Sequence, residues 1–188
     1  DLDELSAGRF VLGLGSATRR MNQDWYDVPF EAPAARMREL VELLRAAFLA
    51  QKGGGFRWEG KHWNLSVPIY SRPGAPRTDI PIWIAAVNRG MIAAAGSSAD
   101  GLVGHPIATR AWHRDVTLPG LREAEVAATA ARMAAFLDRE GEALGARVHL
   151  HVIDNGGTAA IPDHPHVSRI ENPNLGGAGG FARGLALA

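Results

Sequence analysis

Residues 2–16 read LDELSAGRFVLGLGS, and this stretch decides the predicted fold. Ser6-Ala7-Gly8 ends a short helix, and Phe10-Val11-Leu12 is an apolar run that is too short for a helix and typical of a buried strand. Gly13 and Gly15 follow, and because glycine has no Cβ they allow another chain or a ligand to approach. Ligands bind at the carboxyl ends of strands in parallel α/β proteins, so the stretch predicts a strand that leads into a binding site.

The next segments alternate between helix and strand patterns. Residues 33–50 carry apolar residues at helical spacing behind Pro33, and polar residues such as Arg36 are expected to cover the rest of this helix without a chemical role. Residues 56–65 alternate aromatic and polar side chains around a central turn, which predicts a small hairpin. Residues 80–86 form a second short apolar strand. This order of elements predicts an α/β fold with a parallel sheet.

The segment after the second strand predicts an anion-binding turn. Val87-Asn88-Arg89-Gly90 connects the strand to a helix expected over residues 91–98. The unpaired N–H groups and the positive dipole end at the start of a helix favour phosphate. Asn88 is expected to cap this helix, and Arg89 adds positive charge.

Composition narrows the class of protein. The chain has 188 residues, of which 46% are hydrophobic, and its 20 basic and 20 acidic residues cancel. Since no block of like charge occurs, neither nucleic acid nor an acidic membrane surface is expected as a partner. The absence of cysteine excludes disulfides, thiolate metal sites and a cysteine nucleophile. No apolar run approaches the ~20 residues of a membrane span and no signal peptide opens the chain, which predicts a cytoplasmic protein.

Several spaced blocks resemble the luciferase-like family of flavin and deazaflavin oxidoreductases. They are residues 2–16, 29–39 and 95–106, and the resemblance runs to about residue 119. It implies a (β/α)₈ barrel, of which residues 1–119 would form a part, because roughly a third of the family's barrel precedes this block. The resemblance therefore implies a fragment. It also implies that Trp58 and Trp63 cover the side of the barrel rather than line a pocket.

The implied chemistry is hydride or oxygen transfer through FMN or the deazaflavin coenzyme F420, acting on a small organic substrate. The candidate cofactor-contacting residues are Gly13, Gly15, Ser16, Ala86, Val87, Asn88 and His105. His105 is expected at a strand's carboxyl end, where it either contacts the cofactor or transfers a proton, or is satisfied by a backbone carbonyl. No catalytic base is assigned.

The remainder, residues 120–188, is predicted as a separate α/β segment. A long helix is expected over residues 123–144 and a strand over residues 147–153. Residues 152–156 and 172–184 resemble the nucleotide-binding half of inverting family-two glycosyltransferases of the galactofuranosyl branch. That resemblance places Asp154 at a nucleobase, and near a diphosphate it places Gly176, Gly177, Gly179, Gly180 and Arg183.

Two alternatives to the oxidoreductase remain open at this point. The first is a glycosyltransferase fragment that binds a nucleotide sugar. The second is an incomplete barrel without activity, which associates as a homo-oligomer through its open sheet edges. Two histidine pairs, His149 with His151 and His164 with His166, have the spacing of metal ligands, but surface histidines are the preferred interpretation and no metal site is predicted.

Overall fold

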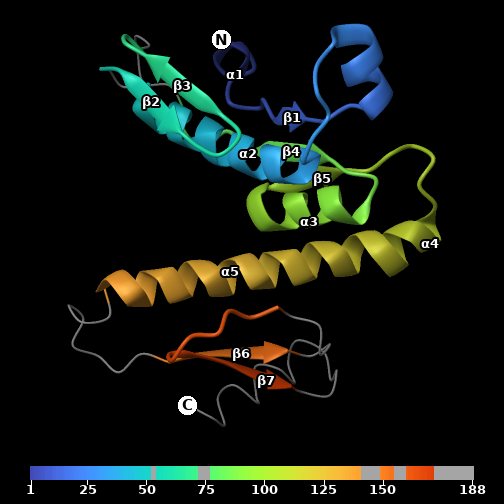
Figure 1. Ribbon diagram of the computed structural model, residues 1–188, viewed down its shortest axis with the longest axis vertical. Helices are drawn as coiled ribbons and strands as arrows, with labels where there is room; N and C mark the ends of the chain where they lie inside the picture. Colours follow the sequence, from blue (N-terminus) through green and yellow to red (C-terminus); the bar gives the residue numbers. More distant parts are fainter. Residues whose placement is uncertain (52–53, 72–76, 141–148, 155–159, 172–188) are drawn as a thin grey trace. The chain divides into compact units, whose positions relative to one another are not determined.

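The computed structural model describes residues 1–51, 54–71, 77–140, 149–154 and 160–171 (Figure 1). The chain divides into two compact units, Asp1–Gly120 and Leu121–Ala188. Both contain parallel strand pairs and helices, so the fold is mixed α/β, as the alternating pattern predicts.

A three-stranded parallel sheet organises the first unit. Its strands are β1 (Leu12–Leu14), β4 (Ile82–Ala85) and β5 (Gly101–Val103), in the order β1-β4-β5. The row Gly13–Trp83–Gly101 lies across all three strands. Because the strands are parallel, their carboxyl ends meet at one edge.

The first strand begins two residues later than its apolar run predicts. The backbone carbonyl of Phe10 accepts a hydrogen bond from Arg77 Nη2 at 3.1 Å. Arg77 in turn pairs with Asp3, with 2.7 Å between Nη2 and Oδ1. The ladder starts only where Leu12 N–H reaches the carbonyl of Pro81, at 2.9 Å. The strand therefore includes Gly13, which was expected to follow it.

One face of this sheet is covered and the other is open. Ile82 and Ile84 are fully buried beside α3 (Arg89–Ser98), which packs against β4 and β5, while α2 (Pro33–Ala50) packs against α3. Burying each isoleucine contributes about 1.5–3 kcal/mol. On the opposite face Trp83 and Val103 remain 42% and 44% exposed.

Trp83 also fills the space above a neighbouring glycine. A Cβ at Gly101 would lie 2.7 Å from the indole Nε1 of Trp83, which is closer than side chains pack. The indole thus occupies the volume that a side chain at position 101 would need.

Asp100 joins the start of β4 to both helices. Its Oδ2 accepts a hydrogen bond from Ile82 N–H at 2.8 Å, and its own N–H donates to the carbonyl of Ile82 at 2.8 Å. Its Oδ1 lies 3.0 Å from Arg45 Nη2 of α2, and Arg45 also donates to the carbonyl of Ser98 at the end of α3. This carboxylate therefore sets where β4 begins.

The predicted hairpin is present and packs on α2. Strands β2 (Phe56–Glu59) and β3 (Asn64–Val67) are antiparallel, and Phe56 is buried with Leu43 and Ala47 of α2. The remaining elements of this unit are short: α1 (Leu2–Leu5), a π-helical turn η1 (Met21–Trp25), α4 (Arg110–Trp112) and a second π-helical turn η2 (His113–Thr117).

The second unit contains most of a long helix and a parallel strand pair. Helix α5 (Leu118–Glu140) begins five residues earlier than expected, because Pro119 fits a first turn, where its missing N–H costs nothing. Strands β6 (Leu150–Asp154) and β7 (Val167–Glu171) pair in parallel, whereas the sequence predicted a strand over residues 147–153. The expected end of the helix, residues 141–144, lies outside the described residues.

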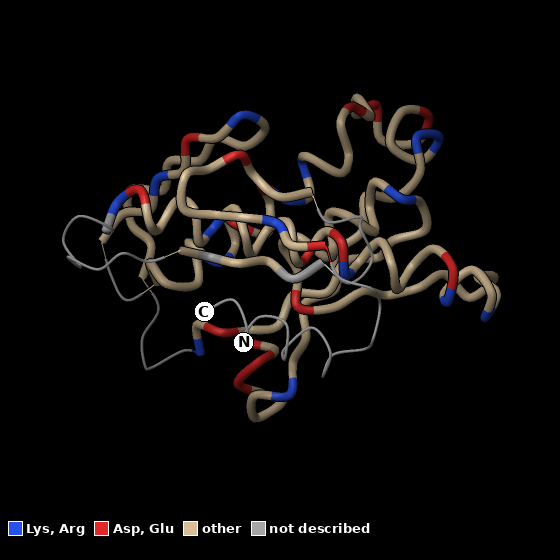
Figure 2. The backbone as a smooth tube through the Cα atoms, turned by 90° about the horizontal axis from the view of Figure 1, so that it is seen from below, with Lys and Arg blue, Asp and Glu red and all other residues tan. Residues whose placement is uncertain are grey.

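Basic and acidic residues are both found along much of the described chain, and Figure 2 shows them interspersed along the backbone. In the part of the chain that the structure describes, no helix combines the length and the apolarity needed to cross a membrane.

Candidate functional site

The carboxyl edge of the sheet gathers most of the predicted site residues. Gly15 and Ser16 follow β1, Ala86 to Asn88 follow β4, and His105 follows β5. A Cβ at Gly15 would lie 3.5 Å from that of Ala85, an ordinary contact, so β1 and β4 remain neighbours beyond their paired residues. The parallel topology thus brings three separate segments to one edge.

Two helices begin at the same edge. Asn88 caps α3 as predicted, because its Oδ1 accepts the N–H of Met91 at 3.0 Å. Helix α2 has no side-chain cap, and Ala32 before it adopts the left-handed conformation with φ 43°. A Cβ at Gly90 would lie 3.8 Å from that of Ala34, so the two helix starts adjoin. Both direct the positive ends of their dipoles to this region.

A cavity of about 210 Å³ opens beside the end of β1. Gly15 and Ser16 form one wall, and one stripe of α2 forms another. The loop before α2 and the hairpin complete it. The lining residues are Gly15, Ser16, Asn22, Val28, Pro29, Phe30, Glu31, Pro33, Arg36, Met37, Leu40 and Trp63.

Arg36 is the basic residue in this wall. Its side chain is half-buried, and its guanidinium carbon lies 4.7 Å from the centre of the Trp63 ring. No carboxylate of the described residues forms an ion pair with it; Glu31 lines the same cavity but is exposed and makes none. A half-buried guanidinium without a counter-ion is suited to bind an anion, and its planar fork matches phosphate or carboxylate.

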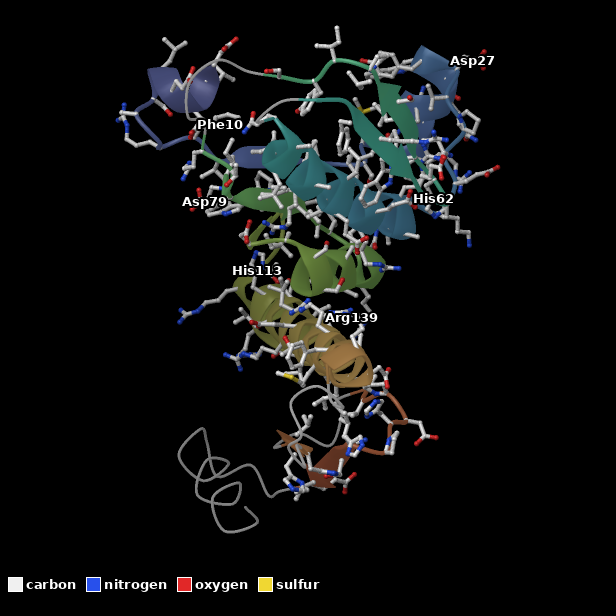
Figure 3. All side chains as sticks on the ribbon, turned by 90° about the vertical axis from the view of Figure 1, so that its left-hand side faces the viewer. Phe10, Asp27, His62, Asp79, His113 and Arg139 are labelled. Atoms are coloured by element: carbon white, nitrogen blue, oxygen red, sulfur yellow. The ribbon has the colours of Figure 1, made fainter. Side chains whose placement is uncertain are left out.

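Glu39 fixes the hairpin turn that carries Trp63. Its carboxylate accepts the backbone N–H of His62 and that of Trp63, each at 2.9 Å (Figure 3 labels His62 in this turn). Burial alone would raise the pKa of Glu39, but these N–H donors and the neighbouring Trp58 indole outweigh it, so the pKa is lowered. A Cβ at Gly60 would overlap Glu39 Oε1. The turn therefore fits an ionised carboxylate on α2.

The loop between β1 and the cavity is held by Asn22. The side-chain amide of Asn22 donates to the backbone carbonyls of Ser16 and Thr18 at 3.0 and 2.8 Å, and its backbone carbonyl accepts the N–H of Val28 at 2.8 Å. These bonds connect the end of β1 to the residues that line the cavity before α2.

The structure does not bring all the predicted residues to the cavity. Gly13 lies within β1, where a Cβ would meet nothing within 4 Å, and Ala86 is buried. Val87 is exposed. His105 is exposed, and its Nδ1 accepts the N–H of Ile107 at 3.2 Å, which closes the turn after β5. The ring of His113, which Figure 3 labels, packs on Gly104, the residue before His105.

Arg36 and Trp63 were not among the site residues predicted from the sequence. Arg36 was expected to have no chemical role, and Trp63 was expected to cover a surface, yet both line the cavity. The signal available was weak: an arginine in the first turn of a helix, followed after 27 positions by a tryptophan whose indole N–H now donates to the carbonyl of Arg36 at 3.0 Å.

The second unit groups the four histidines noted in the sequence. The rings of His149 and His151 lie 4.7 Å apart, and both hydrogen-bond to Ser168 Oγ. His164 pairs with Asp138 at 3.0 Å. Among the described residues, no three histidine, aspartate or glutamate side chains are arranged to hold a metal ion.

Of the residues predicted to bind a nucleotide sugar, only Asp154 lies among the described residues. Asp154 is the last residue of β6, one position beyond the end of the strand predicted from the sequence. The other candidates, Gly176, Gly177, Gly179, Gly180 and Arg183, lie outside the described residues.

Comparison with known proteins places this geometry in context. The model of the luciferase-like monooxygenase family matches residues 1–159. An uncharacterised protein of Mycobacterium tuberculosis is 36% identical over 124 residues, which are 64% of this chain and 36% of that protein. The F420-dependent glucose-6-phosphate dehydrogenase of Kineococcus radiotolerans is 30% identical over 123 residues, 63% of this chain and 34% of that enzyme.

A more distant relative points the same way. The 5,10-methylenetetrahydromethanopterin reductase of Archaeoglobus fulgidus is 29% identical over 103 residues, 54% of this chain and 29% of that enzyme. The chain thus spans about a third of the length of these relatives. The family match continues past residue 119, where the resemblance was expected to end, and nothing in these comparisons supports the glycosyltransferase resemblance.

Proposed function

The chain belongs to the luciferase-like monooxygenase family, and from that premise we propose that it acts as a deazaflavin- or flavin-dependent oxidoreductase on a small organic substrate. We propose further that the sheet and helices of residues 1–120 form part of a (β/α)₈ barrel, whose carboxyl edge carries the site.

One observation carries the cofactor proposal: Arg36 faces a cavity at the point where two helices begin. A half-buried cation without a described counter-ion, next to two positive dipole ends, fits a phosphate. FMN and F420 both carry phosphate on the side chain that leaves their ring system. The residues present therefore fit the anionic end of either cofactor.

The cavity holds only part of such a cofactor. Its volume of about 210 Å³ is below the roughly 300–1,000 Å³ of pockets that enclose drug-sized ligands. We therefore place the phosphate end at Arg36 and Ser16, near the capped turn at Asn88. The ring system would lie along the open carboxyl edge, against Gly13, Gly15 and the backbone at Ala86 and Val87.

When bound, the cofactor supplies hydride or oxygen transfer. The chain's own residues bind and orient it. The proposal gives His105 a proton-transferring role through Nε2, because Nδ1 already accepts the N–H of Ile107. The relative from Kineococcus radiotolerans and two further relatives carry F420-dependent names, so F420 is the preferred cofactor and FMN the alternative.

The test is thermal unfolding of the full chain with F420, with FMN and with uridine diphosphate galactofuranose. A ligand that binds only the native state raises the unfolding temperature by mass action. We expect a shift with F420 or FMN that is lost in Arg36→Ala, and no shift with the sugar nucleotide. If neither flavin shifts the transition, or if Arg36→Ala leaves the shift intact, the proposed site is wrong.

The open face of the sheet supports a second proposal, that copies of the chain associate. Parallel sheets are normally covered on both faces, yet Trp83 and Val103 are exposed on one face of this one. An exposed apolar face of this kind favours a homo-oligomer.

A further inference from the structure

The guanidinium of Arg36 lies over the face of the Trp63 ring. The Trp63 ring centre lies 4.7 Å from its central carbon, a distance at which a cation is attracted to the face of an indole. An arginine side chain has several rotatable bonds, and ordering it is entropically costly. A ring fixed beneath the guanidinium lowers the cost that an incoming anion must overcome.

Trp63 is itself tied to α2 at two points. Its indole Nε1 donates to the carbonyl of Arg36 at 3.0 Å, and its backbone N–H donates to Glu39 Oε1 at 2.9 Å. Arg36 and Glu39 are three residues apart and so lie on the same side of the helix. The tryptophan is therefore fixed against one helical turn through both its side chain and its backbone.

The turn behind Trp63 is equally constrained. Gly60 N–H donates to the carbonyl of Trp63 at 2.9 Å, and the Glu39 carboxylate accepts the N–H of His62 at 2.9 Å. The Glu39 carboxylate is ionised at neutral pH, and the hydrogen bonds that it accepts from the N–H groups of His62 and Trp63 lower its pKa further. A continuous series of contacts thus connects the Glu39 carboxylate through Trp63 to the Arg36 guanidinium.

We propose that Trp63 is a positioning residue that holds the Arg36 guanidinium ready for the cofactor phosphate, so that the hairpin β2–β3 gives the site its preference for a phosphorylated cofactor. This inference rests on the proposed function. It assigns a binding role to a segment that would otherwise only cover α2.

The experiment compares two ligands that differ by one phosphate. The affinities of FMN and riboflavin for the full chain are measured by flavin fluorescence, together with those of the deazaflavin riboside and its 5′-phosphate monoester. The ratio within the tighter pair reports the anion site alone, because the ring system is common to both ligands. A loss of general stability would lower both affinities and leave the ratio unchanged.

Four variants of the full chain are compared. Trp63→Met keeps bulk but removes the aromatic face, and it is expected to lower the phosphate preference about tenfold. Trp63→Phe keeps a smaller face and is expected to lie between Met and the natural residue. Arg36→Ala is expected to abolish the preference. Tyr70→Leu is the matched control, because the Tyr70 ring packs on Phe56 at the open end of the same hairpin, and it is expected to leave the ratio unchanged.

The outcomes separate the two proposals. If the natural chain prefers the phosphorylated ligand, Arg36→Ala abolishes that preference and both Trp63 variants retain it in full, the role of Trp63 is wrong while the anion site stands. A ratio that changes as much in Tyr70→Leu as in Trp63→Met also overturns the role. If the natural chain shows no phosphate preference, the proposed function's anion site fails and this inference fails with it. Should Trp63→Met not fold, the ratio in Trp63→Phe decides.

Discussion

Removing the carboxylate of Asp100 should release the start of β4, and with it the strand that leads to the Asn88 turn. Asp100→Ala leaves the N–H of the fully buried Ile82 without its 2.8 Å acceptor. Losing a hydrogen bond to a charged group costs about 1.5–3 kcal/mol. The half-exposed pair with Arg45 adds at most about 1 kcal/mol. The expected loss in the free energy of unfolding is therefore about 2–4 kcal/mol.

Two companion variants make this prediction specific. Asp100→Asn keeps an oxygen that can accept the N–H of Ile82, so we expect it to cost roughly half as much as alanine. Asp115→Ala removes a carboxylate from the exposed pair with Arg114 and should change stability by less than about 0.5 kcal/mol.

The assay can follow the first unit by itself. All five tryptophans, at positions 25, 58, 63, 83 and 112, lie before residue 121. Urea unfolding monitored by tryptophan fluorescence therefore reports that unit without contribution from the second. If Asp100→Ala and Asp115→Ala shift the transition equally, or if alanine and asparagine at position 100 are indistinguishable, the reasoning about Ile82 N–H is refuted.

Three further predictions concern pH, the site and association. The folded state lowers the pKa of Glu39 from 4.5, so its carboxylate stabilises the fold above pH 4.5, and this contribution is lost as the pH falls through the folded pKa. Glu39→Gln should therefore be less stable than the natural chain at pH 7, and the difference between their free energies of unfolding in urea should become smaller below pH 4.5. A difference that grows in acid would contradict the sign. Gly13→Ala meets nothing within 4 Å, so its urea transition should not fall, whereas a titration with the cofactor should show weaker binding if the ring lies over this strand. Sedimentation velocity of the natural chain should depend on concentration, and Val103→Lys, which places a charge on the open face of the sheet, should reduce that dependence; identical profiles would remove this face as the contact.

Local chemistry was predictable from the sequence. The cap at Asn88 depends on an acceptor three residues before a free N–H, and both lie in one short segment between a strand and a helix. The hairpin at residues 56–67 follows for the same reason, since its strands are separated only by a turn. Helix α2 was predicted with its observed ends, because Pro33 and the apolar spacing are local features.

Contacts between distant segments were not predictable in this way. The carbonyl of Phe10 is bound by an arginine 67 positions away, which removes Phe10 from the ladder although its apolar run suggested a strand. Arg36 occupies a polar position on a helix, and such positions usually face solvent. It lines a cavity because residues 28–31 and the turn at Trp63 fold over that side of α2. The spacing of apolar and polar residues within the helix does not predict this contact.

The side chains at positions 83 and 101 compete for the same space, so the residues that fit at one position depend on the residue at the other. The indole of Trp83 already fills the space over Gly101, so any larger residue at 101 displaces the ring before it can pack. A larger residue at 101 is therefore expected to require a smaller residue or a displaced ring at 83, whereas a smaller residue at 83 creates no clash. A library that randomises both positions together should recover larger residues at 101 mainly with smaller residues at 83, and a library of position 101 alone should favour glycine.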